Sequence, residues 1–411
     1  MSKIKDLIKK LCPNGVEYKK INDVCEKIYA GGTPLTSHEE YYNGNIKWLR
    51  SGEINFNEIY DTEIKITEEG LKNSSAKMIP SKSVVIAMTG ATVARTAMIM
   101  EEMCMNQSVC ALIPKDELNY RFLYQYLTNI YKELKNSGQG VLTSLNLDRI
   151  KKIMIPIPPI EVQEEIVRIL DKFTELEAEL EAELEARKNQ YEFWRGKLLN
   201  KDYNNIKKIF ELTTWDKKFN AVDNYMQIKT IKYPTLLASD LFSLNCNDGD
   251  VFLLSTGEQT GWTKEELAGE KLCEGEVVTI PWGKSRPVSE VMKYYKGRFV
   301  TGDNRIATSN DTSILLNKYL YYWFQNKGPE IDTFYRGAGI QHPNMKKILT
   351  MDIDIPPLMK QKQIVSVLDK YQELTYDITK GIPAEIELRR KQYEYYRNKL
   401  LNFEVLNESN N

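Results

Sequence analysis

The chain has 411 residues, of which 42% are hydrophobic and 27% charged, with 56 basic against 57 acidic side chains. These values are ordinary for a folded protein and exclude a mainly disordered chain, a collagen-like repeat and a disulfide-stabilised miniprotein. The length predicts two or three domains. The even charge balance gives no signal of nucleic-acid binding, because nucleic-acid-binding domains are often strongly basic.

No charge-free apolar run approaches the roughly 18–20 residues of a membrane-spanning helix, so we expect no membrane span. The N-terminus lacks the apolar segment of a secretion signal, and we expect a cytoplasmic protein. The six cysteines form no CxxC pair, and the two histidines, His38 and His342, lie far apart. We therefore expect inert thiols and no metal site. His342 precedes Pro343 in a Gly-rich stretch and is interpreted as a loop residue.

The first predicted elements belong to a mixed α/β domain. Ser83–Met88 is a short apolar run of the kind that forms a strand, and Gly-rich turns such as Ala30–Pro34 and Thr89–Thr92 interrupt the chain around it. Polar loops of this type suit a binding surface, but they suit ordinary turns equally well.

A long helix is predicted to follow, from Ile160 to Leu199. Apolar residues recur every three or four positions from Ile166 to Leu198, and Pro158 and Pro159 mark the start. Forty residues at 1.5 Å each give a helix of about 60 Å. Since no ordinary globular core needs that length, the helix is expected to pair with another long helix.

The centre of this helix consists of three consecutive Glu-Leu-Glu-Ala units, residues 175–186. Residues 153–199 carry 11 acidic and 6 basic side chains, so the acidic excess is local. One interpretation is a solvated acidic helix face. The other is a ruler whose number of units sets a distance, since each unit adds about 6 Å.

An internal repeat defines the organisation of the chain. Ile155–Phe173 returns as Ile353–Tyr371, and the block around Gln190 returns around Gln392. The strand-like runs Asp250–Leu254 and Glu276–Ile280 lie in the second half. The chain is therefore two copies of one plan, a globular part followed by a helical part. The expected boundaries are 1–154 and 203–352 for the globular domains, and 155–202 and 353–405 for the helical regions.

The second helical region is predicted to be broken near 381–383. Gly381 suits the position just after a helix, and Pro383 suits the first turn of a new one. The two helical regions are expected to pack antiparallel and to hold the globular domains apart.

Motifs of common enzyme sites are absent from the sequence. Trp282–Ser285 resembles the end of a phosphate-binding loop, but Val278 stands where that motif needs a glycine. There is no GxGxxG, G-x-S-x-G or H-E-x-x-H motif. We therefore predict no catalytic residue and no resident metal.

Three linked features resemble the specificity (S) subunits of Type I restriction-modification systems. They are Leu11–Lys20 with the following Gly31–Pro34 and Ile46–Ile54, the pair of Ile-Pro-Pro helices ending in Gln-Tyr-Glu-aromatic-aromatic-Arg, and the Glu-Leu-Glu-Ala array. The resemblance covers essentially the whole chain.

The resemblance implies two α/β (α+β) target-recognition domains in pseudo-symmetric tandem repeat, joined by two long antiparallel coiled-coil helices. Each domain would read one half of a split, asymmetric site in double-stranded DNA. The helices would set the half-site spacing and dock two modification (M) subunits for adenine methylation. Restriction (R) subunits would add DNA cleavage in phage defence. The chain itself would be non-catalytic and bind no cofactor, because S-adenosylmethionine, ATP and magnesium belong to the partner subunits.

Candidate contact residues follow from the resemblance and from side-chain chemistry, since cations contact phosphates and polar or aromatic groups contact bases. The DNA-binding candidates of the first half are Thr33, Arg50, Ser51, Lys77, Thr89, Thr92, Arg95, Asn106 and Gln107, with Lys151 and Lys152 as further phosphate contacts. Those of the second half are Gln259, Trp262, Trp282, Lys284, Ser285, Arg286, Asn304 and Arg305, with Arg298, Lys346 and Lys347 as further phosphate contacts. The subunit-interface candidates are Pro158, Pro159, Gln163, Pro356, Pro357 and Gln361.

Two other readings stay open. The chain could be a coiled-coil spacer between protein-binding domains, or an inactive S-like subunit. A methyltransferase–nuclease fused to recognition domains is a third class, and the missing cofactor motifs argue against it.

Overall fold

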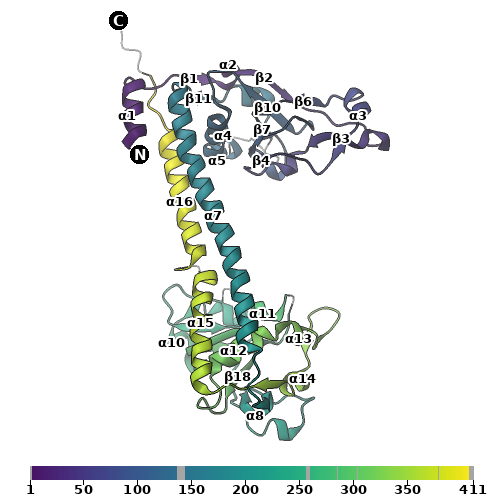
Figure 1. The fold of residues 1–411 in the computed structure, drawn as a ribbon, viewed down its shortest axis with the longest axis vertical. Helices are drawn as coiled ribbons and strands as arrows, with labels where there is room; N and C mark the ends of the chain where they lie inside the picture. The colour runs from purple at the N-terminus through teal and green to yellow at the C-terminus, as the bar shows by residue number, and fades with distance from the viewer. Residues whose placement is uncertain are drawn as a thin grey trace. The chain divides into compact units, whose positions relative to one another are not determined.

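The computed structural model describes residues 2–136, 144–255, 260–284, 286–302, 304–377 and 379–406. The chain divides into two units (Figure 1). Unit 1 comprises Met1–Glu181 and Glu385–Asn411, and unit 2 comprises Ala182–Ala384. Each unit holds one of the two expected α/β domains together with the helical segments that pack on it.

Unit 1 contains a five-stranded and a four-stranded sheet. The larger has the order β2-β10-β7-β8-β4 and the smaller the order β5-β3-β9-β6. The strands of the larger sheet are β2 (Cys25–Ala30), β10 (Val109–Pro114), β7 (Ser83–Ala87), β8 (Thr96–Ile99) and β4 (Glu58–Ile59). Those of the smaller are β5 (Lys65–Ile66), β3 (Tyr42–Leu49), β9 (Met103–Met105) and β6 (Lys77–Ile79).

Helix α4 (Tyr120–Asn129) covers one face of the larger sheet and contacts β7, β8 and β10. The Asn119 side chain caps it by accepting from the backbone N–H groups of Arg121 and Phe122. Phe122 and Leu127 are fully buried in the core beneath it. The other helices of this domain are α1 (Ser2–Leu11), α2 (Ile21–Val24), α3 (Glu68–Lys72), α5 (Tyr131–Asn136) and α6 (Leu147–Lys151).

Unit 2 is built around a six-stranded sheet with the order β13-β18-β16-β17-β14-β15. Its strands are β13 (Thr213–Trp215), β18 (Asn304–Ser309), β16 (Cys273–Pro281), β17 (Lys293–Thr301), β14 (Val251–Leu254) and β15 (Trp262–Thr263). Its helices are α8 (Ile209–Leu212), α9 (Ala238–Ser243), α10 (Glu265–Ala268), α11 (Val288–Val291), α12 (Asn317–Asn326), α13 (Gly328–Asp332) and α14 (Met345–Leu349).

The predicted repeat is present in three dimensions. The order β13-β18-β16-β17 reproduces β2-β10-β7-β8, and α12 contacts β16, β17 and β18 as α4 contacts the strands of unit 1. In each unit a short antiparallel sheet joins the beginning of the domain to its end. In unit 1 it is formed by β1 (Tyr18–Lys20) and β11 (Met154–Pro156), and in unit 2 by β12 (Ile206–Lys208) and β21 (Asp352–Asp354).

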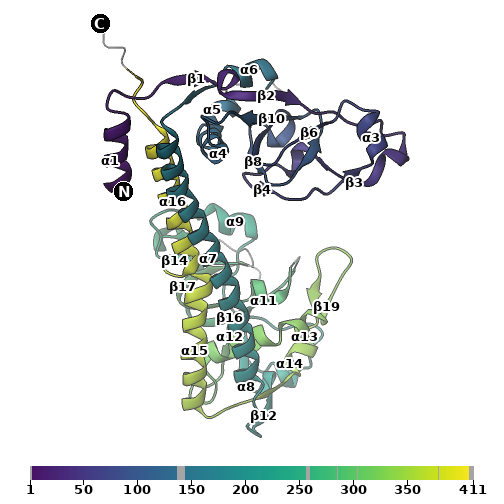
Figure 2. The ribbon, with the colours of Figure 1, turned by 45° about the horizontal axis from the view of Figure 1, so that its top comes forward.

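The long helix α7 runs without interruption from Ile160 to Leu199, with the bounds predicted from the sequence. In unit 1 its first half packs antiparallel to α16 (Ile382–Leu401), and both views place the two helices side by side (Figures 1 and 2). The Phe173 ring stacks on Tyr396 at a centroid distance of 5.4 Å. Arg390 binds Glu177 at 2.6 Å and Glu181 at 2.7 Å, so it joins two successive tetrapeptide units.

In unit 2 the second half of α7 packs near α15 (Leu358–Tyr376), where the rings of Tyr191 and Tyr376 meet edge to face at 5.9 Å. The Tyr191 hydroxyl donates to the side-chain oxygen of Gln325 on α12 at 3.2 Å. Tyr191 therefore joins the long helix to the globular part of this unit.

The predicted break between α15 and α16 is confirmed, with one correction. α15 ends at Tyr376 and α16 begins at Ile382, with Pro383 in its first turn. The prediction that Gly381 comes directly after α15 is wrong. This glycine directly precedes α16. A Cβ at this glycine would lie 2.5 Å from the carbonyl oxygen of Glu373 and 2.7 Å from that of Leu374, so close backbone approach requires the glycine.

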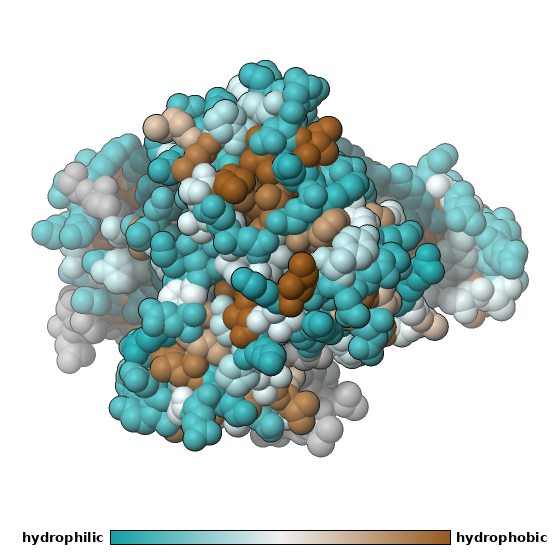
Figure 3. Space-filling view, turned by 90° about the horizontal axis from the view of Figure 1, so that it is seen from below, coloured by the Kyte–Doolittle hydropathy of each residue, from teal (hydrophilic) through white to brown (hydrophobic). Residues whose placement is uncertain are grey.

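The described surface carries scattered apolar residues. In unit 2 these include Ile206, Tyr225 and Ile228, each more than half exposed. Figure 3 shows apolar groups as separate small patches among polar ones. Within the part of the chain that the structure describes, no helix is both long and apolar enough to cross a membrane.

Candidate nucleic-acid interface

The strands of unit 1 bring four polar loops to one end of the sheets. We call such an end, where strands begin or end, an edge, as distinct from an outer strand. In the larger sheet Ala30 pairs with Cys110 and Ala87 pairs with Val109, so β2 and β7 end where β10 begins. Ile86 pairs with Thr96, so β8 begins at the same edge. The loops that leave this edge carry Thr33, Thr89, Thr92 and Arg95.

The smaller sheet ends at the same place. Leu49 on β3 pairs in parallel with Met105 on β9, and Lys77 on β6 also pairs with Met105. Gly32 N–H donates to the carbonyl oxygen of Met105 at 3.0 Å, and Asn106 N–H donates to that of Leu49 at 2.9 Å. Arg50, Ser51, Asn106 and Gln107 thereby join the first group. We call this set of loops (31–34, 50–53, 89–95 and 106–108, with Lys77) edge 1.

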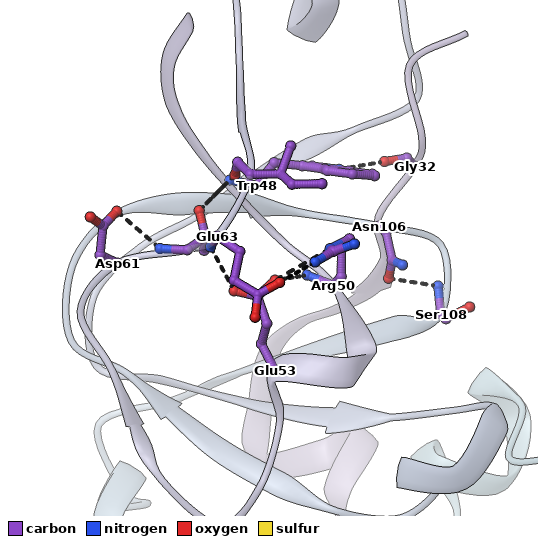
Figure 4. Close-up of polar contacts among 10 residues, drawn as sticks. Gly32, Trp48, Arg50, Glu53, Asp61, Glu63, Asn106 and Ser108 are labelled. Atoms are coloured by element: carbon purple, nitrogen blue, oxygen red, sulfur yellow. Dashed lines mark hydrogen bonds and ion pairs between the residues drawn. The ribbon is translucent and has the colours of Figure 1, made fainter. Parts of the chain in front are cut away.

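Edge 1 is held in shape by internal polar contacts (Figure 4). The indole N–H of Trp48, a buried residue, donates to the carbonyl oxygen of Gly32 at 3.0 Å. The guanidinium of Arg50 forms ion pairs with Glu53 and Glu63. Asn106 accepts from the backbone N–H of Ser108 at 3.1 Å, and the Thr33 hydroxyl bonds to the side chain of Gln107.

The two arginines of edge 1 keep part of their hydrogen-bonding capacity. Arg95 donates through Nη1 to the side-chain oxygen of Asn55 at 2.8 Å. The Nε atoms of Arg50 and Arg95 are buried and have no hydrogen-bond partner. Because these Nε atoms are buried, DNA could reach only the outer guanidinium nitrogens, of which Arg95 Nη1 is already bonded to Asn55. Of the first-half candidates, Lys151 ends α6 and Lys152 follows it directly.

The corresponding edge of unit 2 is formed by three segments of the chain. β16 ends at Pro281, opposite Asn304 at the start of β18, and Trp282 follows directly. β13 ends at Trp215, and the backbone N–H of Asp216 donates to the carbonyl oxygen of Ile306 at 2.9 Å. We call residues 216–219, 282–284 and 304–305 edge 2. The Arg305 guanidinium lies over the rings of Phe219 and Trp282, at 5.4 and 5.8 Å.

Several second-half candidates are engaged within the chain. Lys284 pairs with Asp332 and keeps only 11% of its side chain exposed. Arg298 pairs with Asp250 and Glu265, and Lys346 pairs with Asp223 at 3.0 Å.

The remaining second-half candidates lie in different places. Trp262 is on the outer strand β15, packed on Phe252 and Tyr295, away from edge 2. Arg286 is exposed, and Lys347 lies over the ring of Phe334. Gln259, Ser285 and the side chain of Asn304 lie outside the described residues.

A buried carboxylate stands beside edge 2. Asp216 is 5% exposed, accepts from the backbone N–H of Ile306 through Oδ1 at 3.2 Å, and has no partner for Oδ2. Burial raises the pKa of Asp216 to about 6, although nearby Lys217 and Arg305 favour its charged form. Sequence patterns gave no sign of this group.

The two interface glutamines have an internal role instead of the expected contact with another subunit. Gln163 is fully buried, accepts from Asn119 N–H at 2.9 Å, and donates to the carbonyl oxygens of Glu117 and Pro158 at 2.8 Å. Gln361 is also fully buried and makes the matching contacts, which are Leu316 N–H at 2.9 Å, Ile314 O at 2.7 Å and Pro356 O at 2.9 Å. Each glutamine therefore ties the start of its long helix to the loop before α4 or α12. Pro159 and Pro357 are exposed, whereas Pro158 and Pro356 are buried.

Unit 1 also has a cleft of about 680 Å³ between α4, α7 and α16. Arg121 lies in it and pairs with Glu58 at 2.8 Å and Asp171 at 3.1 Å. The positive charge of Arg121 is therefore balanced by two carboxylates of the same chain. Among the described residues, no group of three or more His, Cys, Asp or Glu side chains could hold a metal ion.

Sequence reasoning missed two parts of the interface region. Asn55, which holds Arg95, follows no pattern that distinguishes it from other loop residues. The segment 335–343 forms a hairpin beside edge 2, with β19 (Tyr335–Arg336) paired to β20 (His342–Pro343). The likeness of Arg336–Ile340 to Ser137–Val141 was the available signal. The latter segment lies outside the described residues.

Comparisons with known proteins agree with this architecture. The model of the Type I restriction modification DNA specificity domain matches the chain twice, over residues 13–186 and 226–388. A specificity subunit of a putative type I restriction enzyme from Haemophilus influenzae is 32% identical, over 94% of this chain and 96% of that protein. The EcoR124I/EcoR124II specificity subunit of Escherichia coli is 28% identical, over 69% of this chain and 70% of its own length.

Solved structures show the same fold. The S subunit of a Type I restriction-modification system from M. genitalium superposes with a TM-score of 0.53 at 14% identity, covering 94% of this chain and 96% of its own. A chain from a study of type I complex assembly superposes with a TM-score of 0.61 at 17% identity, covering 95% and 98%. With the family model matching both halves, the chain belongs to the Type I restriction-modification DNA specificity family, the non-catalytic subunits that carry the DNA-recognition domains of these systems.

Proposed function

We propose that this chain directs a Type I complex to a split, asymmetric DNA site, with unit 1 reading one half and unit 2 reading the other. The observation that carries the proposal is the repeated sheet edge. In both units the same strand ends deliver recognition loops to one edge, but with different side chains. Equivalent positions with different chemistry support two different half-sites.

Edge 1 is suited to hydrogen-bonded readout of bases. It gathers hydroxyl, amide and guanidinium groups, which match the donor and acceptor pattern of the major groove. Its cations are few, and Arg50 is already ion-paired with Glu53 and Glu63. Each phosphate that a cation contacts releases counterions, so affinity is expected to fall as salt rises, and the small number of cations predicts a shallow fall.

The helices α7, α15 and α16 are proposed to set the half-site spacing and to dock two M subunits, with R subunits joining the complex for cleavage. Exposed apolar side chains on these helices, such as Phe193, Met359 and Tyr395, support a docking role. The exposed prolines Pro159 and Pro357 stay in the proposed docking surface, whereas the buried Gln163 and Gln361 do not. S-adenosylmethionine, ATP and magnesium are proposed to bind the partner subunits only.

The test is methylome sequencing of a host that expresses this chain with its cognate M subunit, against the same host without this chain. We expect a split adenine-methylated motif that disappears when the chain is absent. Exchange of edge 1 residues, for instance Asn106→Ala with Gln107→Ala, should relax one half-site and leave the other intact.

Two results would contradict the proposal. A complex that forms and binds S-adenosylmethionine but methylates no motif would favour an inactive S-like subunit or a protein-binding spacer. A relaxation of both half-sites by the edge 1 substitutions would contradict the division of reading between the units.

A further inference from the structure

The hairpin 335–343 is bonded to edge 2 on both sides of Trp282. The Tyr335 hydroxyl donates to the carbonyl oxygen of Pro281 at 2.5 Å. The backbone N–H of Lys284 donates to the carbonyl oxygen of Gln341 at 3.2 Å. The loop after β16 and the hairpin are therefore one structural piece, although the two lie some 60 residues apart in the chain.

His342 holds the Trp282 side of this piece. The two rings lie 4.0 Å apart between centroids, and the imidazole Nδ1 is 3.0 Å from the carbonyl oxygen of Trp282. Both side chains are exposed, with Trp282 at 37%. A histidine bonded to the backbone and lying against the indole restricts the rotamers of Trp282, so the exposed part of the indole has a defined direction.

The tip of the hairpin adds an aliphatic side chain. Ile340 is 66% exposed. A Cβ at Gly283 would lie 2.4 Å from Cγ2 of Ile340, so the glycine allows the isoleucine to rest against the Trp282 loop. Exposed apolar side chains next to an aromatic ring are the groups that contact the thymine methyl or enter a base step.

Apart from the buried Asp216, the charged groups next to this apolar group are positive or ion-paired. Arg305 lies over the Trp282 ring, and Arg336 is exposed on β19 opposite His342. Asp332 is occupied by Lys284 and by the backbone N–H of Val288. A polyanion can therefore approach without meeting an uncompensated carboxylate from the hairpin.

We propose that Trp282 and Ile340 contact the 5-methyl group of a thymine in the half-site that unit 2 reads, and that His342 is the positioning residue for Trp282. This inference rests on the proposed function and names the chemistry of one half-site. It contrasts with edge 1, where the corresponding loop carries Thr89 and no aromatic ring. Unit 1 reads by hydrogen bonds, and unit 2 reads at least one position by apolar contact.

The first test alters the DNA and leaves the protein intact. The purified complex of this chain with its M subunits is titrated with duplexes that carry the methylome-derived motif, in which each thymine of the second half-site is replaced in turn by deoxyuridine. At one position the loss of the methyl group should weaken binding by about fivefold or more. Ile340→Ala and Trp282→Ala should each reduce the preference for thymine over deoxyuridine, and the two substitutions together should abolish it. Equal binding of all duplexes by the unaltered complex would overturn the inference.

The second test separates the ring of His342 from its hydrogen bond. His342→Phe keeps a ring against Trp282 and should retain thymine discrimination, whereas His342→Ala and His342→Gln should lose it. His38→Ala is the matched control, because the His38 side chain is 44% exposed and stacks on an aromatic ring, Tyr41, at 4.8 Å in unit 1. The His38→Ala variant should still distinguish thymine from deoxyuridine in the second half-site. Equal loss in the Phe and Ala variants would contradict a positioning role for the ring.

The two levels of proposal fail differently. If the complex methylates no split motif, the proposed function itself is contradicted. If the motif is methylated but thymine discrimination survives both Ile340→Ala and Trp282→Ala, only the apolar contact is contradicted. Thermal unfolding of each variant identifies a loss of folding, and the deoxyuridine series then still decides the inference.

Discussion

At the scale of single residues, Gln163 and Gln361 show how the repeat is built. Each is fully buried and satisfies three backbone groups in its own unit. A glutamine has one acceptor and two donors on its side-chain amide, which matches these three contacts. The glutamine of the repeated Pro-Pro-x-x-x-Gln pattern therefore fixes the start of each helix from inside its own unit.

Gln163→Ala or Gln361→Ala is expected to destabilise the unit that holds it by about 2 kcal/mol or more, because buried backbone groups lose their partners. Denaturant unfolding measures this. Gln190→Ala, which changes an exposed side chain bonded only to Arg187 within α7, should change the unfolding free energy by less than about 0.5 kcal/mol. Equal effects of the buried and the exposed substitutions would contradict the internal role.

Asp216 makes a second prediction at this scale, on pH. Because burial raises its pKa to about 6, the folded chain binds a proton more tightly than the unfolded chain between about pH 4 and pH 6. Stability therefore falls as pH rises through that window. Asp216→Asn removes the buried charge and should gain about 1–3 kcal/mol over the native chain above pH 7.

The gain from Asp216→Asn should shrink as pH falls and vanish only below about pH 3, where the side chain is neutral in both the folded and the unfolded chain. Chemical denaturation at pH 4.5, 6 and 7.5 measures the trend, since the Asp216 carboxyl of the folded chain becomes charged across that range. Asp248→Asn, at an exposed position of the same unit, is the control and should show no such trend. A gain that is constant with pH would exclude desolvation of the carboxylate as its cause.

At the scale of elements, the boundary between α15 and α16 is defined by a close backbone approach. Gly381→Ala places a methyl group within 3 Å of three carbonyl oxygens, those of Glu373, Leu374 and Asp377. The junction must shift, and we expect a loss of about 1–3 kcal/mol in the unfolding of unit 2. Gly52→Ala, where a Cβ would meet nothing within 4 Å, should be nearly neutral. A neutral Gly381→Ala would mean that the junction can yield without cost.

How far the sequence predicts these elements depends on the range of the interactions. The bounds of α7 follow from local signals, namely two prolines and an apolar period, and they match the structure. The break before Pro383 is equally local. The sheet orders were not predicted, because β10 pairs with β2 and β7 through residues that lie far apart in the chain.

In the candidate site, too, local features could be predicted from the sequence and contacts between distant residues could not. Nine side chains of the first half were chosen by type and fell on one edge, since each follows or precedes a strand that the turn residues marked. In the second half, Lys284 and Arg298 form ion pairs with Asp332 and Asp250, which composition alone could not predict. His342 was assigned to a loop from its Gly-rich surroundings, and its contact with Trp282 could not be predicted because the two residues are distant in sequence.

At the scale of the whole molecule, the boundary between the two units falls within the tetrapeptide array, since unit 1 reaches Glu181 and unit 2 begins at Ala182. We propose that the length of the array can change without altering either α/β domain. Its carboxylates recur every four residues, so after one added unit Arg390 would again face two successive glutamates. Four residues advance a helix by about 400°, only about 40° beyond one turn, so the leucine stripe keeps its direction.

Insertion of one further Glu-Leu-Glu-Ala after Ala186 should lengthen α7 by about 6 Å, a little under two base-pair steps of about 3.4 Å. We expect the methylated motif to keep both half-sites and to gain about two base pairs between them. Methylome sequencing of the insertion variant measures the change directly. An insertion of only Glu-Leu turns the helix by about 200° and should abolish methylation, because the stripe then faces away from its partner. If the four-residue variant methylates the original motif with its original spacing, the array is a solvated helix face and the spacing is set elsewhere.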